Sequence, residues 1–307
     1  MPNVSVLISV YNGEDFISKA IDSVLVQTYK NFEILLIDDN SKDSTSDILI
    51  KYAKKFPKKI KLFRNKKNIG LTKCLIKIMK NSKGKYIARL DADDFWHKDK
   101  LKIQINFLNK NKKVVLLGSS GFKVDSNNNV ISKIGLNNLN HKSLKNKLLF
   151  KNYFLHSSII FNKNIYYKSG GYNSDFKFSQ DYDLWLKISK IGNIGNLDNN
   201  LIYLRQHKNS ITSKNKKIQS LFAFIISCTH KSKTNIKLKN KNLFNLIKEL
   251  KQNTEKTHFN SLCYLYSEYL PVYFSKNIFS LNFQIIKYLL KDKNFFIRKT
   301  IKKIILK

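Results

Sequence analysis

Arginine is scarce in this sequence, although basic residues dominate it. Four of the 57 basic residues are arginines (Arg64, Arg89, Arg205 and Arg298), and all the others are lysines. Proteins that read bases or phosphates favour the planar guanidinium, because it donates two parallel hydrogen bonds. The shortage of arginine therefore argues against specific nucleic-acid binding. A lysine excess with abundant Asn, Ile and Phe is also typical of an AT-rich genome.

Cysteine and long apolar runs are scarce as well. The three cysteines, Cys74, Cys228 and Cys263, are odd in number and far apart, which excludes a disulfide framework and a CxxC metal site. No run approaches the roughly 18 apolar residues of a membrane-spanning helix, and no secretory signal opens the chain. We therefore expect a cytoplasmic protein without a transmembrane segment.

Acidic residues are few: 21 Asp and Glu stand against 57 Lys and Arg, so the formal net charge is +36. Residues 201–307 carry +18 of this charge, whereas the carboxylates concentrate in residues 1–100. Such an excess suggests a polyanionic partner, which can be a nucleic acid, an anionic membrane face or a phosphorylated substrate. The uneven distribution predicts two regions with different roles.

Short apolar runs alternate with helical periodicities over the first 118 residues. Strands are predicted at 4–10, 32–37, 61–63, 86–90 and 114–117, with helices at 16–25, 44–54, 71–79 and 98–108. This alternation is typical of βαβ units and a parallel sheet. Polar residues collect after the strands, at the edge where open α/β sheets bind ligands.

The pattern is looser after residue 118. It predicts a hairpin around 122–131, a strand at 156–161, a helix at 183–188, a strand at 201–204 and only helices from about 213.

Three carboxylates follow the strand predicted at 86–90: Asp91, Asp93 and Asp94. Carboxylates one residue apart at a strand end can hold a hard divalent cation that bridges a diphosphate. The alternative is a solvated turn in which Asp94 caps the next helix. The position after a buried-type strand favours the cation site.

Two further carboxylates have a functional and a structural interpretation. Asp39, which follows the second strand, can accept a hydrogen bond from a base or a sugar hydroxyl, or it belongs to an Asx turn. Asp181, which precedes an amphipathic helix, is either a general base or a helix N-cap. Trp185, on that helix, is expected in the core.

Five segments occur in a familiar order and spacing: VSVLISVYN (4–12), QTY (27–29), FEILLIDDNS (32–41), LDADD (90–94) and QDYDLW (180–185). Together they resemble the family 2 glycosyltransferases with the GT-A fold, over roughly residues 1–210. The resemblance implies a Rossmann-like, mostly parallel central sheet with flanking helices, and sugar transfer with inversion from a nucleotide sugar.

The resemblance also implies roles for particular residues. In this family the nucleotide base is held at positions that correspond to Ser9, Val10, Tyr11 and Asp39. Asp91 would contact the ribose or the sugar.

The remaining implied roles concern the metal and the base. Asp93 would bind Mn²⁺ or Mg²⁺ on the sugar diphosphate, and His207, in an Arg-x-His segment, would touch the metal or the diphosphate. A surface histidine is the alternative for His207. Asp181 would be the catalytic base. Gln180 stands where Glu is frequent, which leaves an inactive glycan-binding relative as an alternative.

The last third of the chain contains a basic amphipathic pattern at residues 294–306. Isoleucines fall on one helical face and lysines lie off it. Such a helix is typical of membrane-surface binding, with each lysine near an anionic leaflet contributing about 1 kcal/mol. The alternative is a helix that packs on the catalytic domain.

We therefore predict a GT-A catalytic domain at 1–212, with a nucleotide-sugar-binding half at 1–118 and an acceptor-binding half at 119–212, and a basic α-helical region at 213–307. The predicted activity is that of a metal-dependent inverting hexosyltransferase that uses a UDP-sugar and a glycan or lipid-linked acceptor in surface polysaccharide or lipopolysaccharide synthesis. We expect it in the cytoplasm, at the inner membrane face, without a specific nucleic-acid partner. The alternative is a non-catalytic basic protein that binds nucleic acid or glycan.

Overall fold

A computed structural model of the chain describes residues 1–135, 141–208, 210–231 and 252. The chain divides into two compact units, the first of residues 1–146 and 153–210, the second of residues 147–152 and 211–307. The domain boundaries predicted from the sequence, at residues 118 and 212, stay predictions.

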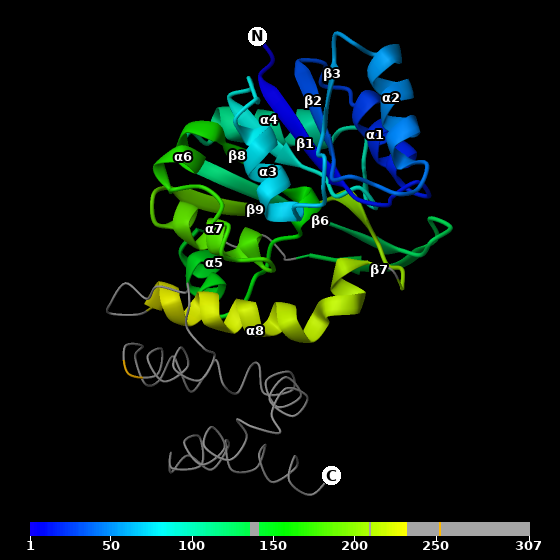
Figure 1. Cartoon of the computed structure of the whole chain (residues 1–307). Helices are drawn as coiled ribbons and strands as arrows, with labels where there is room; N and C mark the ends of the chain where they lie inside the picture. Colours follow the sequence, from blue (N-terminus) through cyan, green and yellow to red (C-terminus); the bar gives the residue numbers. More distant parts are fainter. Residues whose placement is uncertain (136–140, 209, 232–251, 253–307) are drawn as a thin grey trace, which may run out of the picture. The chain divides into compact units, whose positions relative to one another are not determined.

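The described strands of the first unit form one sheet with the order β3-β2-β1-β4-β8-β6-β9-β5, and β7 pairs with β6 outside this path (Figure 1). Four neighbours run parallel: β1 (Val4–Val10), β2 (Phe32–Asp38), β3 (Ile60–Arg64) and β4 (Tyr86–Arg89). The residues of β1 and β2 are almost all buried, as expected for parallel strands with both faces covered.

The other half of the sheet is mixed. The strand β8 (Ile160–Asn162) runs antiparallel to both β4 and β6 (Val114–Val124). The long β9 (Asn193–Arg205) is parallel to β6, and the short β5 (Phe95–Trp96) is antiparallel to β9. The strand β7 (Val130–Ile134) completes an antiparallel hairpin with β6, which confirms the predicted hairpin.

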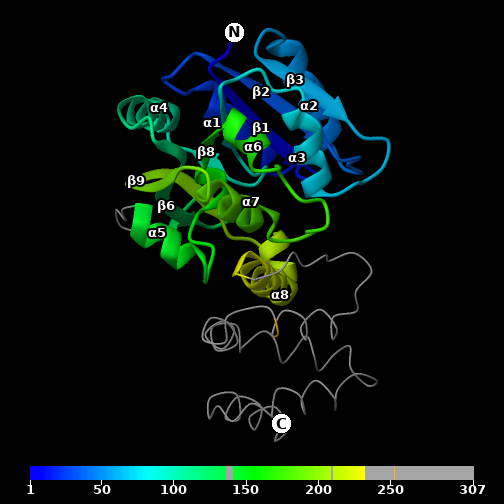
Figure 2. The same cartoon turned by 90° about the vertical axis from the view of Figure 1, so that its left-hand side faces the viewer.

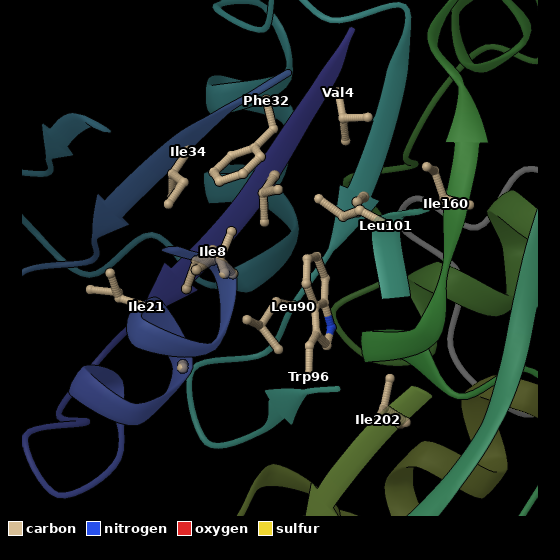
Figure 3. Close-up of a cluster of buried hydrophobic side chains, with 14 of the residues drawn as sticks. Val4, Ile8, Ile21, Phe32, Ile34, Leu90, Trp96, Leu101, Ile160 and Ile202 are labelled. Atoms are coloured by element: carbon tan, nitrogen blue, oxygen red, sulfur yellow. The ribbon is translucent and has the colours of Figure 1, made fainter. Parts of the chain in front are cut away.

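Helices lie on both faces of this sheet (Figures 1 and 2). A buried apolar cluster joins alternate residues of β1 and β2 to α1 (Ile17–Leu25), α2 (Thr45–Lys55) and α4 (Lys100–Lys110), and Figure 3 shows part of it around Trp96. The helix α3 (Leu71–Met79) packs on β1 and β2, and α7 (Gln180–Ser189) packs on β6 and β9. The short α5 (His141–Leu148) and α6 (Lys163–Lys168) complete the elements of residues 1–210.

The predicted strand at 156–161 is partly wrong. Residues His156–Ser158 form a 3₁₀ turn, and the strand β8 starts only at Ile160. Because β8 is antiparallel to β4, with Ala88 opposite Ile160, the turn lies at the carboxyl end of β4. A local apolar run predicts that a strand is present, but the residue at which the strand begins is the least reliable part of such a prediction.

The described part of the second unit includes α8 (Ile211–Lys231), which has a kink at Asn215. Among the described residues, no helix is long and apolar enough to cross a membrane. The helices predicted beyond residue 231, including the basic amphipathic one at 294–306, lie outside the described residues.

Candidate active site

Asp91 directly follows β4 and its carboxylate is held from two sides. Arg89 Nη2 donates to Asp91 Oδ1 at 2.9 Å, and His156 Nδ1 lies 3.0 Å from Asp91 Oδ2. Arg89 is fully buried and its Nε donates to Nε2 of the same histidine at 3.3 Å. Because a guanidinium can only donate, Nε2 accepts and Nδ1 carries the proton that His156 gives to Asp91.

Asp93 lies beside His207, with 3.0 Å between Oδ2 and Nε2. The two residues are 114 positions apart in the sequence, and the antiparallel pairing of β5 with β9 brings them together. The ring of Phe16, the N-cap residue of α1, packs against His207 with 4.9 Å between the centroids. The surface-histidine alternative is therefore wrong, because the side chain of His207 is only 14% exposed.

Asp94 has a structural role. It accepts hydrogen bonds from the hydroxyl of Ser157 and from the backbone N–H of Arg205, the latter at 2.8 Å. The N-cap position of the next helix, α4, belongs to Asp99, so the capping role considered for Asp94 is wrong. The buried Arg205 also donates from Nε to the backbone oxygen of Asp93 at 2.8 Å. This hydrogen bond ties the segment 91–94, called the acidic loop, to the end of β9.

The three carboxylates have different electrostatic environments. Burial alone would raise the pKa of Asp91, but His156 and Arg89 outweigh it and hold that pKa well below its usual range. The pKa of Asp93 is raised, first by burial and then by the negative charge of Asp91. Burial raises the pKa of Asp94 further, and both neighbouring carboxylates add to the shift. A cation bound at this loop would offset the repulsion between the carboxylates and would lower the pKa of Asp93.

The residues at this loop fit a divalent cation that a ligand helps to hold. Within the described ranges no cluster of three or more His, Cys, Asp or Glu side chains is placed to bind a metal. Asp93 and His207 supply two donors, a carboxylate oxygen and an imidazole nitrogen. A cation bound by one or two protein groups takes its other ligands from substrate phosphates and water.

Asp39 is buried, and its carboxylate organises the segment between β3 and α3. It accepts hydrogen bonds from the side chain of Asn65 at 2.8 Å and from the backbone N–H groups of Ile69 and Gly70 at 2.9 and 2.8 Å. The thiol of Cys74 also hydrogen-bonds to this carboxylate. The Asx turn considered for this region is formed by Asp38, which accepts from the N–H of Ser41 at 2.9 Å.

The thiol of Cys74 hydrogen-bonds to the side chains of both Asp39 and Ser9. Ser9 therefore lies close to Asp39. The amide of Asn65 donates to its sulfur at 3.2 Å. Burial and the charge of Asp39 raise the pKa of the Cys74 thiol to about 12. Of the other residues predicted at the nucleotide base, Val10 is buried and Tyr11 is 48% exposed.

Asp181 lies in the first turn of α7 and is half-buried. Ser179, with the left-handed φ of 55°, takes the N-cap position, so the N-cap alternative for Asp181 is wrong. The next acidic residue, Asp183, is buried and pairs with Lys187 at 2.6 Å. Trp185 is fully buried, as predicted.

Sequence reasoning missed Arg89 and His156. Arg89 stands two residues before Asp91, in a buried strand, and an arginine inside an apolar run is a usable signal for a carboxylate partner. His156 is far from the acidic loop in sequence, and no local pattern links the two.

This mixed, mostly parallel sheet with an acidic site at its carboxyl edge is a GT-A-like α/β fold. The chain belongs to glycosyl transferase family 2, since residues 5–170, more than half of it, match that domain. The resemblance that the sequence motifs suggested is therefore confirmed.

Relatives with the same family name support this assignment. The chain is 32% identical over 220 residues to an uncharacterised glycosyltransferase of Haemophilus influenzae, covering 69% of this chain and 68% of that protein. It is 34% identical over 201 residues to one from Rickettsia prowazekii, and this match spans 60% of the Rickettsia protein. A Bacillus subtilis protein named as glycosyltransferase EpsE is 33% identical over 208 residues, 67% of this chain and 73% of that protein.

Two solved structures share the fold. Staphylococcus aureus TarS 1-349 in complex with UDP-GlcNAc has a TM-score of 0.63 at 17% identity, covering 88% of this chain and 82% of that one. The mannosyltransferase PcManGT from Pyrobaculum calidifontis, in complex with GDP-Man and Mn²⁺, has a TM-score of 0.58 at 14% identity. The match covers 98% of this chain and 79% of that one.

Proposed function

We propose that this chain is a metal-dependent inverting glycosyltransferase that moves a hexose from a nucleotide sugar, a UDP-sugar, to a hydroxyl of a glycan or lipid-linked acceptor. The observation that carries the proposal is the pair Asp93–His207 beside the rigidly held Asp91, at the carboxyl edge of the sheet. Family membership adds the reaction class.

Each residue has a task in this proposal. Ser9, Val10, Tyr11 and Asp39 bind the nucleotide base, and Asp91 binds the ribose or the sugar. Asp93 and His207 hold Mn²⁺, or Mg²⁺, on the diphosphate. When bound, the cation supplies charge neutralisation on the departing diphosphate. The donor set suits Mn²⁺ better, because an imidazole nitrogen is a softer donor than a carboxylate oxygen.

Asp181 is the general base in this proposal. A base that takes the proton from the acceptor hydroxyl needs access to the substrate, and Asp181 is half-buried at the start of α7. Asp183 does not suit this task, because Lys187 already occupies its carboxylate. Direct displacement of the diphosphate by the activated hydroxyl inverts the anomeric centre without a covalent intermediate.

The ligands of the two structural neighbours support the donor class. TarS binds UDP-GlcNAc and PcManGT binds GDP-Man with Mn²⁺. A lipid-linked acceptor would place the enzyme at the inner face of the cell membrane, where the lysine-rich last third would meet anionic lipid.

A donor panel tests the proposal. UDP-glucose, UDP-galactose, UDP-GlcNAc, GDP-mannose and dTDP-glucose are each titrated with Mn²⁺, and Tm and donor hydrolysis are measured. We expect one donor to raise Tm and to be hydrolysed only with the cation present. Donor binding without hydrolysis of any donor would indicate the non-catalytic glycan-binding alternative, and no binding at all would reject the function.

A further inference from the structure

We propose that Ser157 is a positioning residue of this active site, whose hydroxyl fixes the acidic loop in the shape that presents Asp93 to a cation and Asp91 to the donor. This inference rests on the proposed function and deepens it, because it names the group that holds both ends of the loop. None of the five segments that suggested the family includes Ser157, which is 66 residues from Asp91 in the sequence.

The acidic loop is a tight turn. The N–H of Asp94 donates to the backbone oxygen of Asp91 at 3.2 Å, which is the hydrogen bond of a β-turn over residues 91–94. Asp93 occupies the third position of this turn, and its carboxylate lies 3.0 Å from His207. The direction in which Asp93 points therefore depends on how the two ends of the turn are held.

One buried hydroxyl joins these two ends. Ser157 is fully buried, and its Oγ accepts a hydrogen bond from the N–H of Asp91 at 3.0 Å. The same hydroxyl donates to Oδ2 of Asp94. Because a serine hydroxyl has a single proton, accepting from Asp91 leaves that proton for Asp94. Ser157 thus connects the first and the last residue of the turn through two hydrogen bonds.

Further contacts hold the turn on both sides. His156, the residue before Ser157, contacts the carboxylate of Asp91, while Ser157 contacts its backbone. The other carboxylate oxygen of Asp94, Oδ1, accepts from the backbone N–H of Arg205 at 2.8 Å. The carboxylate of Asp94 therefore links the 3₁₀ turn at 156–158 to the end of β9, and Asp93 lies between these fixed points.

Buried polar side chains of β5 and α4 hold the 3₁₀ turn. Trp96 Nε1 donates to the backbone oxygen of Ser157 at 2.7 Å, and Gln104 Nε2 donates to that of Ser158 at 2.8 Å. Lys100 is fully buried, and its Nζ donates to Gln104 Oε1 at 2.8 Å and lies 3.9 Å from the centroid of the Trp96 ring. Since each of these groups has a fixed partner, Ser157 presents its hydroxyl to the acidic loop from a preorganised turn.

The test compares Ser157→Ala with Ser158→Ala. The control residue belongs to the same 3₁₀ turn and is also fully buried. Its hydroxyl makes two hydrogen bonds as well, since it accepts from the N–H of Ser119 at 3.1 Å and donates to the backbone oxygen of Leu155 at 2.7 Å. Each substitution removes one buried hydroxyl, so we expect similar decreases in Tm. Only Ser157→Ala releases the acidic loop.

Three measurements separate positioning from stability. They are hydrogen exchange of peptides that contain Asp91 or Ser119, calorimetry of Mn²⁺ binding in the presence of the nucleoside diphosphate of the donor, and steady-state transfer. For Ser157→Ala we expect faster exchange at Asp91, about 10- to 100-fold weaker Mn²⁺ binding and about 100-fold lower transfer. Ser158→Ala should exchange faster at Ser119 and should bind Mn²⁺ and transfer sugar like the wild type.

Equal Mn²⁺ binding and equal transfer in the two alanine variants would overturn the inference and leave Ser157 with a role in stability alone. If Ser157→Ala does not fold, Ser157→Cys takes its place, because a thiol fills the site but is a weak donor. Wild-type Mn²⁺ binding and transfer by the cysteine variant would overturn the inference as well. A wild-type chain that binds no nucleotide sugar would reject the proposed function and the inference together.

Discussion

Nδ1 of His156 lies 3.0 Å from Oδ2 of Asp91, although 65 residues separate them in the sequence. With Arg89 on the other carboxylate oxygen, this contact leaves Asp91 one orientation. The acidic loop therefore has one carboxylate that an arginine and a histidine hold from two sides, and another, Asp93, that pairs with His207.

The first prediction concerns this positioning. His156→Ala should lower sugar transfer by about 100-fold, since a displacement of about 1 Å at a reacting group can cost that much. Steady-state kinetics with the donor checks it. The control His97→Ala removes a histidine that is 38% exposed, and it should transfer normally. Wild-type transfer by His156→Ala would show that Arg89 alone positions Asp91.

The second prediction concerns the metal pair. Asp93→Asn should abolish Mn²⁺-dependent transfer, because an anionic ligand is lost. Its Tm without metal should not fall, since the substitution removes negative charge beside Asp91. Asp198→Asn, at an exposed position of β9, is the charge-matched control and should be fully active. Activity in the presence of EDTA would contradict a metal role.

The third prediction separates the two carboxylates of α7. Asp181→Asn should lower transfer by about 10²–10⁴-fold and keep donor affinity, because it removes a positioned base. Asp183→Asn should instead reduce the free energy of unfolding by about 1–3 kcal/mol, since it weakens the contact with Lys187. Kinetics and thermal unfolding of both variants decide the assignment. Near-normal transfer by Asp181→Asn would remove this residue from the mechanism.

The fourth prediction concerns Asp39. Asp39→Ala should weaken UDP binding by about 1–3 kcal/mol and destabilise the fold by a similar amount, because it leaves the N–H groups of Ile69 and Gly70 unpaired. Asn65→Ala removes one contact to Asp39 and keeps the carboxylate, so it should retain most of the UDP affinity. Calorimetry with UDP checks both variants, and unchanged affinity in Asp39→Ala would place the base elsewhere.

The fifth prediction concerns Cys74, whose thiol pKa is raised to about 12. Only the thiolate reacts with iodoacetamide, and at pH 8 about one thiol in 10⁴ is ionised at such a pKa. We expect no labelling of the Cys74 peptide in the folded protein at pH 8 and rapid labelling in urea, as followed by mass spectrometry. The labelling rate should rise with pH as the thiolate fraction grows. Rapid labelling of the folded protein at pH 8 would show an accessible thiolate.

The parallel half of the sheet was predictable, because its signals are local. A buried strand such as Val4–Val10 is a continuous apolar run, and its carboxyl end is visible as the polar residues that follow. Asp39, Asp91 and Asp93 were therefore placed at one edge of a sheet before their contacts were known. The two-residue strand β5 was missed, because so short a strand has no period of its own.

The partners of these carboxylates depend on distant pairing. The antiparallel direction of β8 brings His156 to Asp91, and the pairing of β5 with β9 brings His207 to Asp93. Neither direction follows from a local pattern, because the hydrophobic period of a strand is the same whichever way it runs. Local sequence patterns thus determined the strands, the helices and the position of the acidic loop at the carboxyl edge of the sheet. Strand pairing across the sheet decided which distant side chains contact the carboxylates of that loop.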